Sequence, residues 1–351
     1  MDLVMHLKQL TMATGLSGYE AGARSVIQQA WQPLADDFRT DALGNLIALK
    51  RGTRPAGAAT RAVLLAAHMD EIGLMITGYE GAFLRFTRVG GVDLRTILGQ
   101  EVTVHGRREL AGVVSSRPPH VLSEEERSAP VPADKLFIDV GLTADELPEL
   151  VQVGDLVSMR RETIELAEGY LSGKAMDDRA GVASLTVCLE ELQRLHHEWD
   201  VYAVATTQEE VGLKGAMVSA YGTAPTAAIA VDVGFGAQPG VSEEEAIEMD
   251  GGPSIAIGPN IHPRLYEALV QVATAHELKY QIEVAPGQTG TDAWAIQVAR
   301  EGIPSALLSV PLRYMHTSVE TLCLRDVQRT GRLMALTISA LDEAFVASLT
   351  Q

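Results

Sequence analysis

The sequence contains few cysteines, few aromatic residues and no long apolar run. Only two of its 351 residues are cysteines, Cys188 and Cys323, and they form no CxxC spacing. A disulfide framework and a thiolate metal site are therefore not expected. Each cysteine lies in an apolar pattern of helical spacing, so we expect two buried thiols in a reducing cytoplasm.

The longest apolar stretches, residues 62–67 and 227–231, are far shorter than the roughly 18 to 20 residues that a membrane-spanning helix needs. The first residues, Met1-Asp2-Leu3, do not resemble a secretory signal. Positive charge is also scarce, since 46 Asp and Glu against 28 Lys and Arg give a net charge of −18. Because this charge repels phosphate backbones and anionic lipid, we expect a soluble, cytoplasmic protein that binds neither nucleic acid nor membranes.

The remaining composition, with 46% hydrophobic and 21% charged residues, is typical of a folded chain with one large or two ordinary domains. Short runs rich in Val, Ile, Leu and Ala predict buried strands at Ala62–Ala67, Val201–Thr206, Ala227–Val233 and Ser305–Val310. Amphipathic spacing predicts helices at Gly181–Arg194, Leu265–Leu278, Thr291–Arg300 and Asp326–Leu349. Alternating strands and helices indicate an α/β sheet with helices on both faces.

The segment from about Gly73 to Leu166 differs from this pattern. Gly90-Gly91 and Pro118-Pro119 punctuate alternating runs such as Glu101–His105, which are typical of a small β-rich unit. Because strands and helices alternate on both sides of it, we interpret it as an insertion into one α/β domain. The main domain then comprises residues 1–72 and 165–351, and the insertion residues 73–164.

Ligands of open α/β sheets bind outside the carboxyl ends of the strands, so polar residues that follow the apolar runs are candidate site residues. These are His68 and Asp70, the pair Asp177-Asp178, the pair Glu209-Glu210, Asp232, and His316. Each also has a structural explanation. A strand-end histidine can simply be hydrogen-bonded, adjacent aspartates can cap a helix, and paired glutamates are usually solvated. A lone carboxylate such as Asp232 within an apolar strand, however, requires a cation.

Two histidines and several carboxylates at successive strand exits could bind two divalent ions, with one carboxylate bridging them. Mixed imidazole and carboxylate ligands suit Zn, Co or Mn better than Ca or Mg. A water held there would become nucleophilic, and a carboxylate that is not a ligand would serve as its general base. The Glu209-Glu210 pair can divide these two tasks.

The motifs Ala67-His68-Met69-Asp70-Glu71-Ile72-Gly73, Asp177-Asp178-Arg179, Gln208-Glu209-Glu210-Val211-Gly212 and Arg313–Thr317 occur in this order. With them the chain resembles the M42 family of co-catalytic metallo-aminopeptidases, which includes the tetrahedral TET particles. The resemblance covers nearly the whole chain. It implies a co-catalytic zinc-peptidase fold, with a mixed, mostly parallel sheet flanked by helices, and assigns residues 73–164 as a dimerisation domain.

The resemblance also implies a role for each candidate. Asp177 would bridge two metal ions, His68 and Asp232 would complete one site, and Glu210 and His316 the other. Glu209 would be the general base. Asp70 would hold the second nitrogen of His68.

The expected activity is removal of N-terminal residues from short peptides by a homo-oligomer, either a dimer or dimers assembled into a tetrahedral dodecamer. Alternatives are another two-metal amide hydrolase, such as an N-acyl amino acid deacylase or a carboxypeptidase, and a catalytically silent assembly subunit. Glycoside hydrolysis fits poorly, because paired carboxylates for that reaction need no histidine cluster. The preferred N-terminal residue and the native metal stay open.

Overall fold

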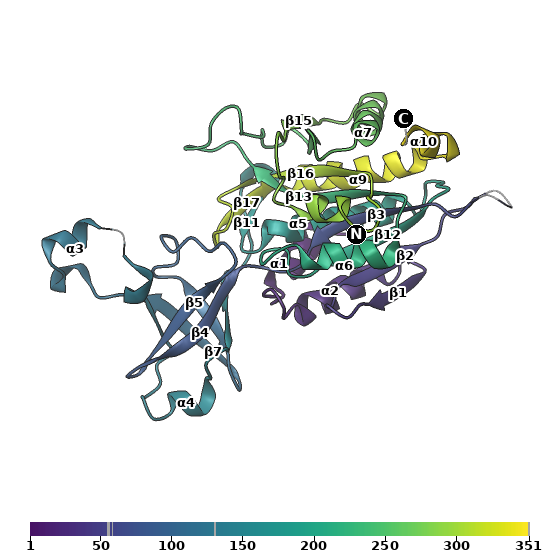
Figure 1. Ribbon diagram of the computed structural model, residues 1–351. Coiled ribbons are helices and arrows are strands. Elements are labelled where there is room, and N and C mark those ends of the chain that lie inside the picture. Colours follow the sequence, from purple (N-terminus) through teal and green to yellow (C-terminus); the bar gives the residue numbers. More distant parts are fainter. Residues whose placement is uncertain (55–56, 58, 130, 350–351) are drawn as a thin grey trace.

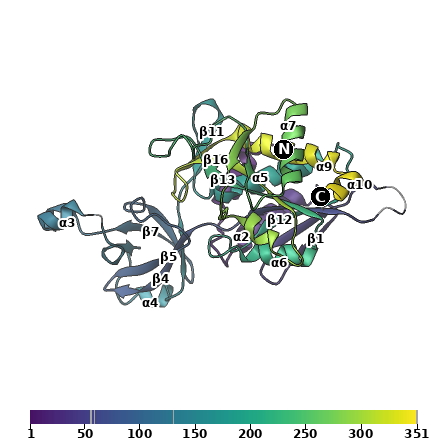
Figure 2. The same cartoon turned by 45° about the horizontal axis from the view of Figure 1, so that its top comes forward.

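A computed structural model describes residues 1–54, 57, 59–129 and 131–349, and within them the chain forms a large mixed sheet and a small barrel. Figure 1 shows the barrel to one side of the layered α/β part, and Figure 2 shows the same separation from another angle. The strand order of the main path is β1-β2-β12-β3-β13-β16-β17-β11-β10, with β14 and β15 attached beside β16. The expected fold class, an α/β sheet with an inserted small β-rich unit, is confirmed.

The strands of the large sheet are β1 (Asp37–Thr40), β2 (Leu46–Lys50), β3 (Ala62–His68), β10 (Ile164–Glu165), β11 (Tyr170–Gly173), β12 (Asp200–Thr206), β13 (Ala227–Phe235), β14 (Ser254–Ile257), β15 (Gln281–Val284), β16 (Ser305–Arg313) and β17 (Glu320–Cys323). The central strands β12, β3, β13 and β16 are parallel neighbours, and they contain the four predicted apolar runs. Their carboxyl ends therefore meet at one edge of the sheet, while antiparallel strands extend the sheet on both sides.

Helices cover both faces of this sheet, and each face has its own apolar cluster. Along β3, Val63 and Leu65 pack toward α1, α2, α5 and α9, whereas Leu64 and Ala66 pack toward α6 and α8. This alternation follows from the two-residue period of a strand. A strand buried on both faces is necessarily apolar throughout, which is why these strands were recognisable in the sequence.

The helices are α1 (Leu3–Met12), α2 (Ala21–Trp31), α3 (Glu124–Ser128), α4 (Leu147–Leu150), α5 (Met176–Glu191), α6 (Lys214–Thr223), α7 (Pro263–Ala275), α8 (Asp292–Gln297), α9 (Leu324–Ala340) and α10 (Glu343–Ser348). One prediction was wrong: the stretch Asp326–Leu349 is two helices. The chain is extended at Leu341, and Asp342 caps α10 by accepting a hydrogen bond from Phe345 N–H at 2.8 Å.

The inserted segment contains a closed barrel in the order β4-β5-β8-β7-β6-β9. Its strands are β4 (Gly73–Glu80), β5 (Phe83–Val89), β6 (Glu101–His105), β7 (Glu109–Ser115), β8 (Phe137–Asp139) and β9 (Leu156–Met159). Val102 and Val104 point into its apolar interior, as the alternation in the sequence predicted. Each of these six strands is paired with a neighbour on both sides, which closes the barrel.

Both cysteines are buried free thiols, as predicted. The helical assignment of Cys323 was wrong, because this residue ends β17 and α9 begins at the next residue. Among the described helices, none combines the length and the apolar character that crossing a membrane would require.

Candidate metal centre

The strand exits bring the predicted site residues together at one edge of the sheet. His68 is the last residue of β3, Asp232 lies in β13, and the Glu209-Glu210 pair follows β12. Asp177 is the second residue of α5, and His316 follows β16. Because β12, β3, β13 and β16 are parallel neighbours, their ends deliver these side chains to one place.

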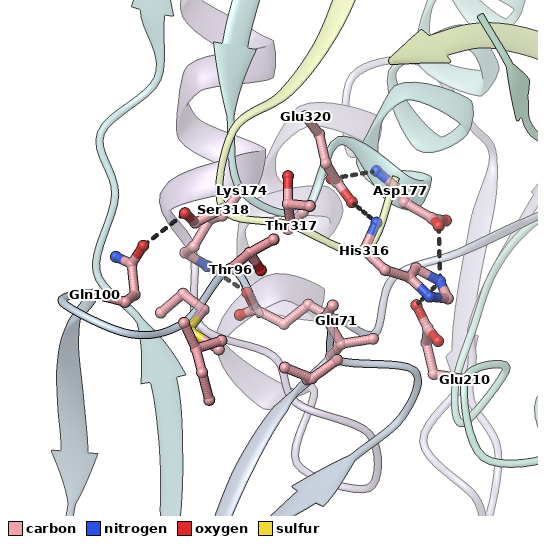
Figure 3. Close-up of a pocket in the computed structure, with 15 residues that line it drawn as sticks. Glu71, Thr96, Gln100, Lys174, Asp177, Glu210, His316, Thr317, Ser318 and Glu320 are labelled. Atoms are coloured by element: carbon pink, nitrogen blue, oxygen red, sulfur yellow. Dashed lines mark hydrogen bonds and ion pairs between the residues drawn. The ribbon is translucent and has the colours of Figure 1, made fainter. Parts of the chain in front are cut away.

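The carboxylate of Asp177 lies between two imidazoles. Its Oδ1 is 2.9 Å from Nε2 of His68, and its Oδ2 is 3.4 Å from Nε2 of His316. His316 Nε2 also lies 3.5 Å from Glu210 Oε1. Figure 3 shows Asp177, Glu210 and His316 pointing toward one another. One oxygen of Asp177 thus faces the imidazole of His68, and the other faces the imidazole of His316, which lies beside Glu210.

The cluster fits divalent cations by its chemistry. Atoms of His68, Asp177 and Glu210 lie within 4.8 Å of one another, and so do atoms of His68, Asp178 and Asp232. Burial raises the pKa of Asp232 and of Asp178 well above the usual range, and repulsion between these two carboxylates adds to the shift of Asp178. Asp178 Oδ2 is buried without a hydrogen-bond partner. A metal ion would favour the ionised carboxylates and use the free oxygen atoms.

Carboxylate groups lie close to both imidazoles. Hydrogen bonding to Asp177 and Glu210 raises the pKa of His316 to about 11. Burial would lower the pKa of His68, but hydrogen bonds to Asp177 and Asp70 raise it well above its usual value. The neighbouring carboxylates therefore favour a positive charge at this place. Bound metal cations would supply that charge, and the imidazoles would then stay neutral.

Asp70 holds several parts of the site at once. Its carboxylate accepts hydrogen bonds from Ser17 Oγ at 2.6 Å and from the N–H groups of Glu209 and Glu210 at 3.0 and 3.2 Å. Its Oδ1 lies 3.5 Å from His68 Nδ1, while its main-chain oxygen is closer, at 3.2 Å. Asp70 therefore faces the second nitrogen of His68 and also fixes the backbone that carries both glutamates.

Glu320 also holds the backbone of two predicted site residues. One carboxylate oxygen accepts a hydrogen bond from Asp177 N–H at 3.1 Å, and the other accepts one from His316 N–H at 2.9 Å (Figure 3). Glu320 is 2% exposed, and burial raises its pKa well above the usual range. The two predicted ligands are thus held in position by a single buried side chain.

Glu209 lies beside the cluster and is mostly buried. Its Oε2 is 4.0 Å from His68 Nε2, and burial raises its pKa to about 10. The carboxylate is close enough to meet a water held between the imidazole and carboxylate groups. Bound cations would lower the pKa of Glu209, so that its carboxylate could accept a proton.

Three residues at the site adopt left-handed backbone conformations although they are not glycine. They are Ala175 with φ 54°, Gln208 with φ 55° and His316 with φ 62°. Ala175 lies just before Asp177, and Gln208 lies directly before Glu209. His316 is itself a predicted ligand. Such conformations cost energy and persist where surrounding contacts enforce them.

The inserted barrel reaches the cluster through the loop after β5. An added Cβ at Gly91 would overlap the imidazole of His316, and at Gly90 it would lie 3.3 Å from Glu210 Oε2. A second contact joins the same two parts, because Ser318 Oγ donates to Gln100 Oε1 at 2.6 Å (Figure 3). The barrel therefore contacts the segment that carries His316.

A cavity of about 600 Å³ opens beside the cluster. It is lined by the candidate site residues His68, Asp177, Glu209, Glu210, Asp232 and His316. Residues 288–291 and Trp294 also line it. The candidate metal ligands thus face a space large enough for a small peptide-like ligand.

Three more buried polar residues belong to this region; sequence reasoning named Asp178 as a candidate and missed Asp292 and Glu320. Asp178 accepts a hydrogen bond from Gly181 N–H at 2.8 Å, so the helix-capping explanation applies to it and not to Asp177. Asp292 accepts a hydrogen bond from Thr206 Oγ at 2.5 Å, and burial raises its pKa to about 6. Glu320 lies three residues after the Arg313–Thr317 motif, and the sequence predicted no role for it. Among these, only the Asp178 contact had a local signal in the sequence.

Comparison with known proteins gives consistent matches over the whole chain. A family model described as M42 glutamyl aminopeptidase matches residues 44–333. The lysyl aminopeptidase of Pyrococcus furiosus is 35% identical over 333 residues, which cover 93% of this chain and 94% of that protein.

Two solved structures extend this comparison. The crystal structure of a TET aminopeptidase from a marine sediment archaeon of the Thaumarchaeota matches with a TM-score of 0.93 at 31% identity, covering 99% of this chain and 98% of that one. The TET1 peptidase of Pyrococcus horikoshii, which can assemble into a tetrahedron or a large octahedral shell, matches with a TM-score of 0.83 at 33% identity, covering 96% and 99%.

Proposed function

The chain belongs to the M42 peptidase family, and we propose that it is a two-metal aminopeptidase that releases N-terminal residues from short peptides. The observation that carries this proposal is the position of Asp177, whose two oxygens face His68 and His316 separately. That geometry supports Asp177 as the bridge between two ions. His68 and Asp232 would complete one site, and Glu210 and His316 the other.

When bound, two Zn, Co or Mn ions would supply Lewis acidity for the attacking water and for the scissile carbonyl. Glu209 would accept a proton from that water and deliver it to the amine that leaves. Asp70 would keep Glu209 in reach through its hydrogen bond to the Glu209 N–H, and it would orient His68. Glu320 would hold the backbone of Asp177 and His316.

We also propose that residues 73–164 mediate dimerisation and that dimers assemble further; the similar Pyrococcus horikoshii peptidase can assemble into a tetrahedron or a large octahedral shell. The barrel is a closed unit beside the main sheet (Figure 1), so a partner could pack on it without disturbing the sheet. Sedimentation of the full chain would measure the assembly.

The activity is tested with free and N-acetylated amino-acid amides, after chelator treatment and reconstitution with Co, Zn or Mn. Metal-dependent cleavage of free amides alone would support an aminopeptidase. Cleavage that requires the acetyl group would instead support a deacylase, and release of C-terminal residues from peptides would support a carboxypeptidase. Inactivity with every metal would favour a silent assembly subunit.

A further inference from the structure

The charged side chains that line the cavity beside the metal centre are predominantly negative. Apart from the cluster itself, Glu245 and Glu283 line it, and among the described lining residues there is neither lysine nor arginine. The proposed metal ions would offset the carboxylates of the cluster. Glu245 and Glu283 come from other segments of the chain, and their charges add a negative potential that favours a cationic ligand.

Glu283 is built into the cavity wall. It lies on β15, and its Oε2 accepts hydrogen bonds from Ser254 Oγ at 2.6 Å and from Ser309 Oγ at 2.7 Å. Both serines are almost fully buried, with exposures of 0% and 1%. Two fixed hydroxyl donors on one oxygen hold the carboxylate in place and leave its Oε1 available to a ligand.

The sheet register sets the distance between Glu283 and the metal centre. Ser309 on β16 is paired with Asp232 on β13 and with Ser254 on β14. Since neighbouring strands lie about 4.8 Å apart, the carboxylate oxygen that bonds both serines lies roughly 5 to 10 Å across the sheet from the Asp232 backbone. A substrate whose N-terminal residue is bound at the metal centre therefore needs a long side chain to reach Glu283.

The cavity also has apolar lining residues. Leu213, Met217, Trp294, Leu307 and Met315 line the same cavity. Apolar lining together with a fixed carboxylate matches a side chain with a methylene stem and a cationic tip. A glutamate side chain would instead place its negative charge beside Glu283, with no cation among the described lining residues to compensate it.

The geometry points to a preference for peptides with an N-terminal lysine or arginine, with Glu283 as the residue that recognises the positive charge. Glu245 at the exposed rim adds to the negative potential of the entrance. This inference rests on the proposed aminopeptidase function and specifies its substrate class.

The test compares kcat/KM for the amides of lysine, arginine, norleucine and glutamate, using the metal-reconstituted full chain. Norleucine has the same four-carbon stem as lysine without the ammonium group, so their ratio isolates the charge. We expect lysine to exceed norleucine by about tenfold or more, mainly through a lower KM. Glu283→Gln should bring this ratio close to one while norleucine turnover continues. Glu244→Gln removes an equal charge from an exposed neighbour of Glu245 outside the cavity lining and should keep the ratio.

A second measurement is calorimetric binding of free lysine and free norleucine to the same proteins. Lysine should bind more tightly than norleucine to the wild type and to Glu244→Gln, but equally to Glu283→Gln. A wild-type preference for norleucine or glutamate amides overturns the inference, whatever the variants do, while leaving the aminopeptidase function intact. Failure to cleave any free amide with any metal overturns both.

Discussion

The side chain of Glu320 accepts a hydrogen bond from the backbone N–H of Asp177 at 3.1 Å, and this contact connects the start of β17 to the start of α5. The other oxygen of Glu320 holds His316 N–H. A glutamine at this position can accept only one of these bonds, because its amide nitrogen is a donor. We expect Glu320→Gln to weaken metal binding about tenfold or more, measured by competition with a chelating dye. Glu125→Gln, on the exposed α3, should bind metal like the wild type. Unchanged affinity in Glu320→Gln would exclude the positioning role.

Contact between Gly91 and His316 predicts that the barrel loop influences the metal centre. Because a methyl group at Gly91 would overlap the His316 imidazole, Gly91→Ala should displace the ring and lower both metal content and turnover. Gly78→Ala is the matched control in the same barrel, since its added Cβ would have no neighbour within 4 Å. Metal analysis and amide hydrolysis on both variants check this. Equal metal content in the two proteins would contradict the predicted link.

The two adjacent aspartates allow a direct test of the bridge. Asp177→Asn should lose most of its bound metal, because the residue contacts donors of both proposed sites. Asp178→Asn keeps the oxygen that accepts the Gly181 N–H and changes only the group at the unpartnered Oδ2, so we expect it to retain more metal than Asp177→Asn. Metal analysis after dialysis distinguishes the two variants. The opposite pattern, with metal lost only from Asp178→Asn, would assign the bridge to Asp178.

His6 predicts a pH dependence of stability far from the metal centre. It is 5% exposed on α1, with Nε2 at 3.0 Å from Thr186 Oγ. Burial lowers its pKa to about 4, against the opposing effect of Glu190. The unfolded state, with a pKa near 6.5, then binds a proton that the folded state does not, so stability is lost as the pH falls from about 6.5 to about 4.

A non-ionisable residue should remove this contribution. In His6→Gln we expect the fall in unfolding free energy between pH 6.5 and 4 to be smaller than in the wild type, by up to about 3 kcal/mol. Urea unfolding of both chelator-treated proteins at equal concentration measures the difference. Parallel pH profiles would show that His6 is protonated in the folded protein as readily as in the unfolded one.

Much of the architecture was predictable because buried parallel strands are apolar along their whole length. β3 and β13 were recognised from that feature alone, and the residues that end or interrupt such strands, His68 and Asp232, were then conspicuous. The alternation in β6 similarly indicated a strand with one buried face. Both patterns are local, so a single sequence contains them.

Other features depend on contacts that the sequence does not reveal. β17 is four residues long and joins α9 without a turn, so Cys323 was assigned to the helix. The break at Leu341 has neither glycine nor proline to mark it. Asp292 and Glu283 act through hydroxyl groups that are distant along the chain, Thr206 for the first and Ser254 and Ser309 for the second. Their positions follow from strand order, which becomes known only with the fold.

The role of Glu209 is the central claim, and it is tested most directly by measuring turnover and metal content on the same preparation of Glu209→Gln. We expect two ions per subunit, as in the wild type, together with a loss of kcat of about a hundredfold or more, because the variant cannot accept the proton of the attacking water. Wild-type turnover in a fully loaded variant would contradict the general-base role. Loss of metal would show that Glu209 is itself a ligand.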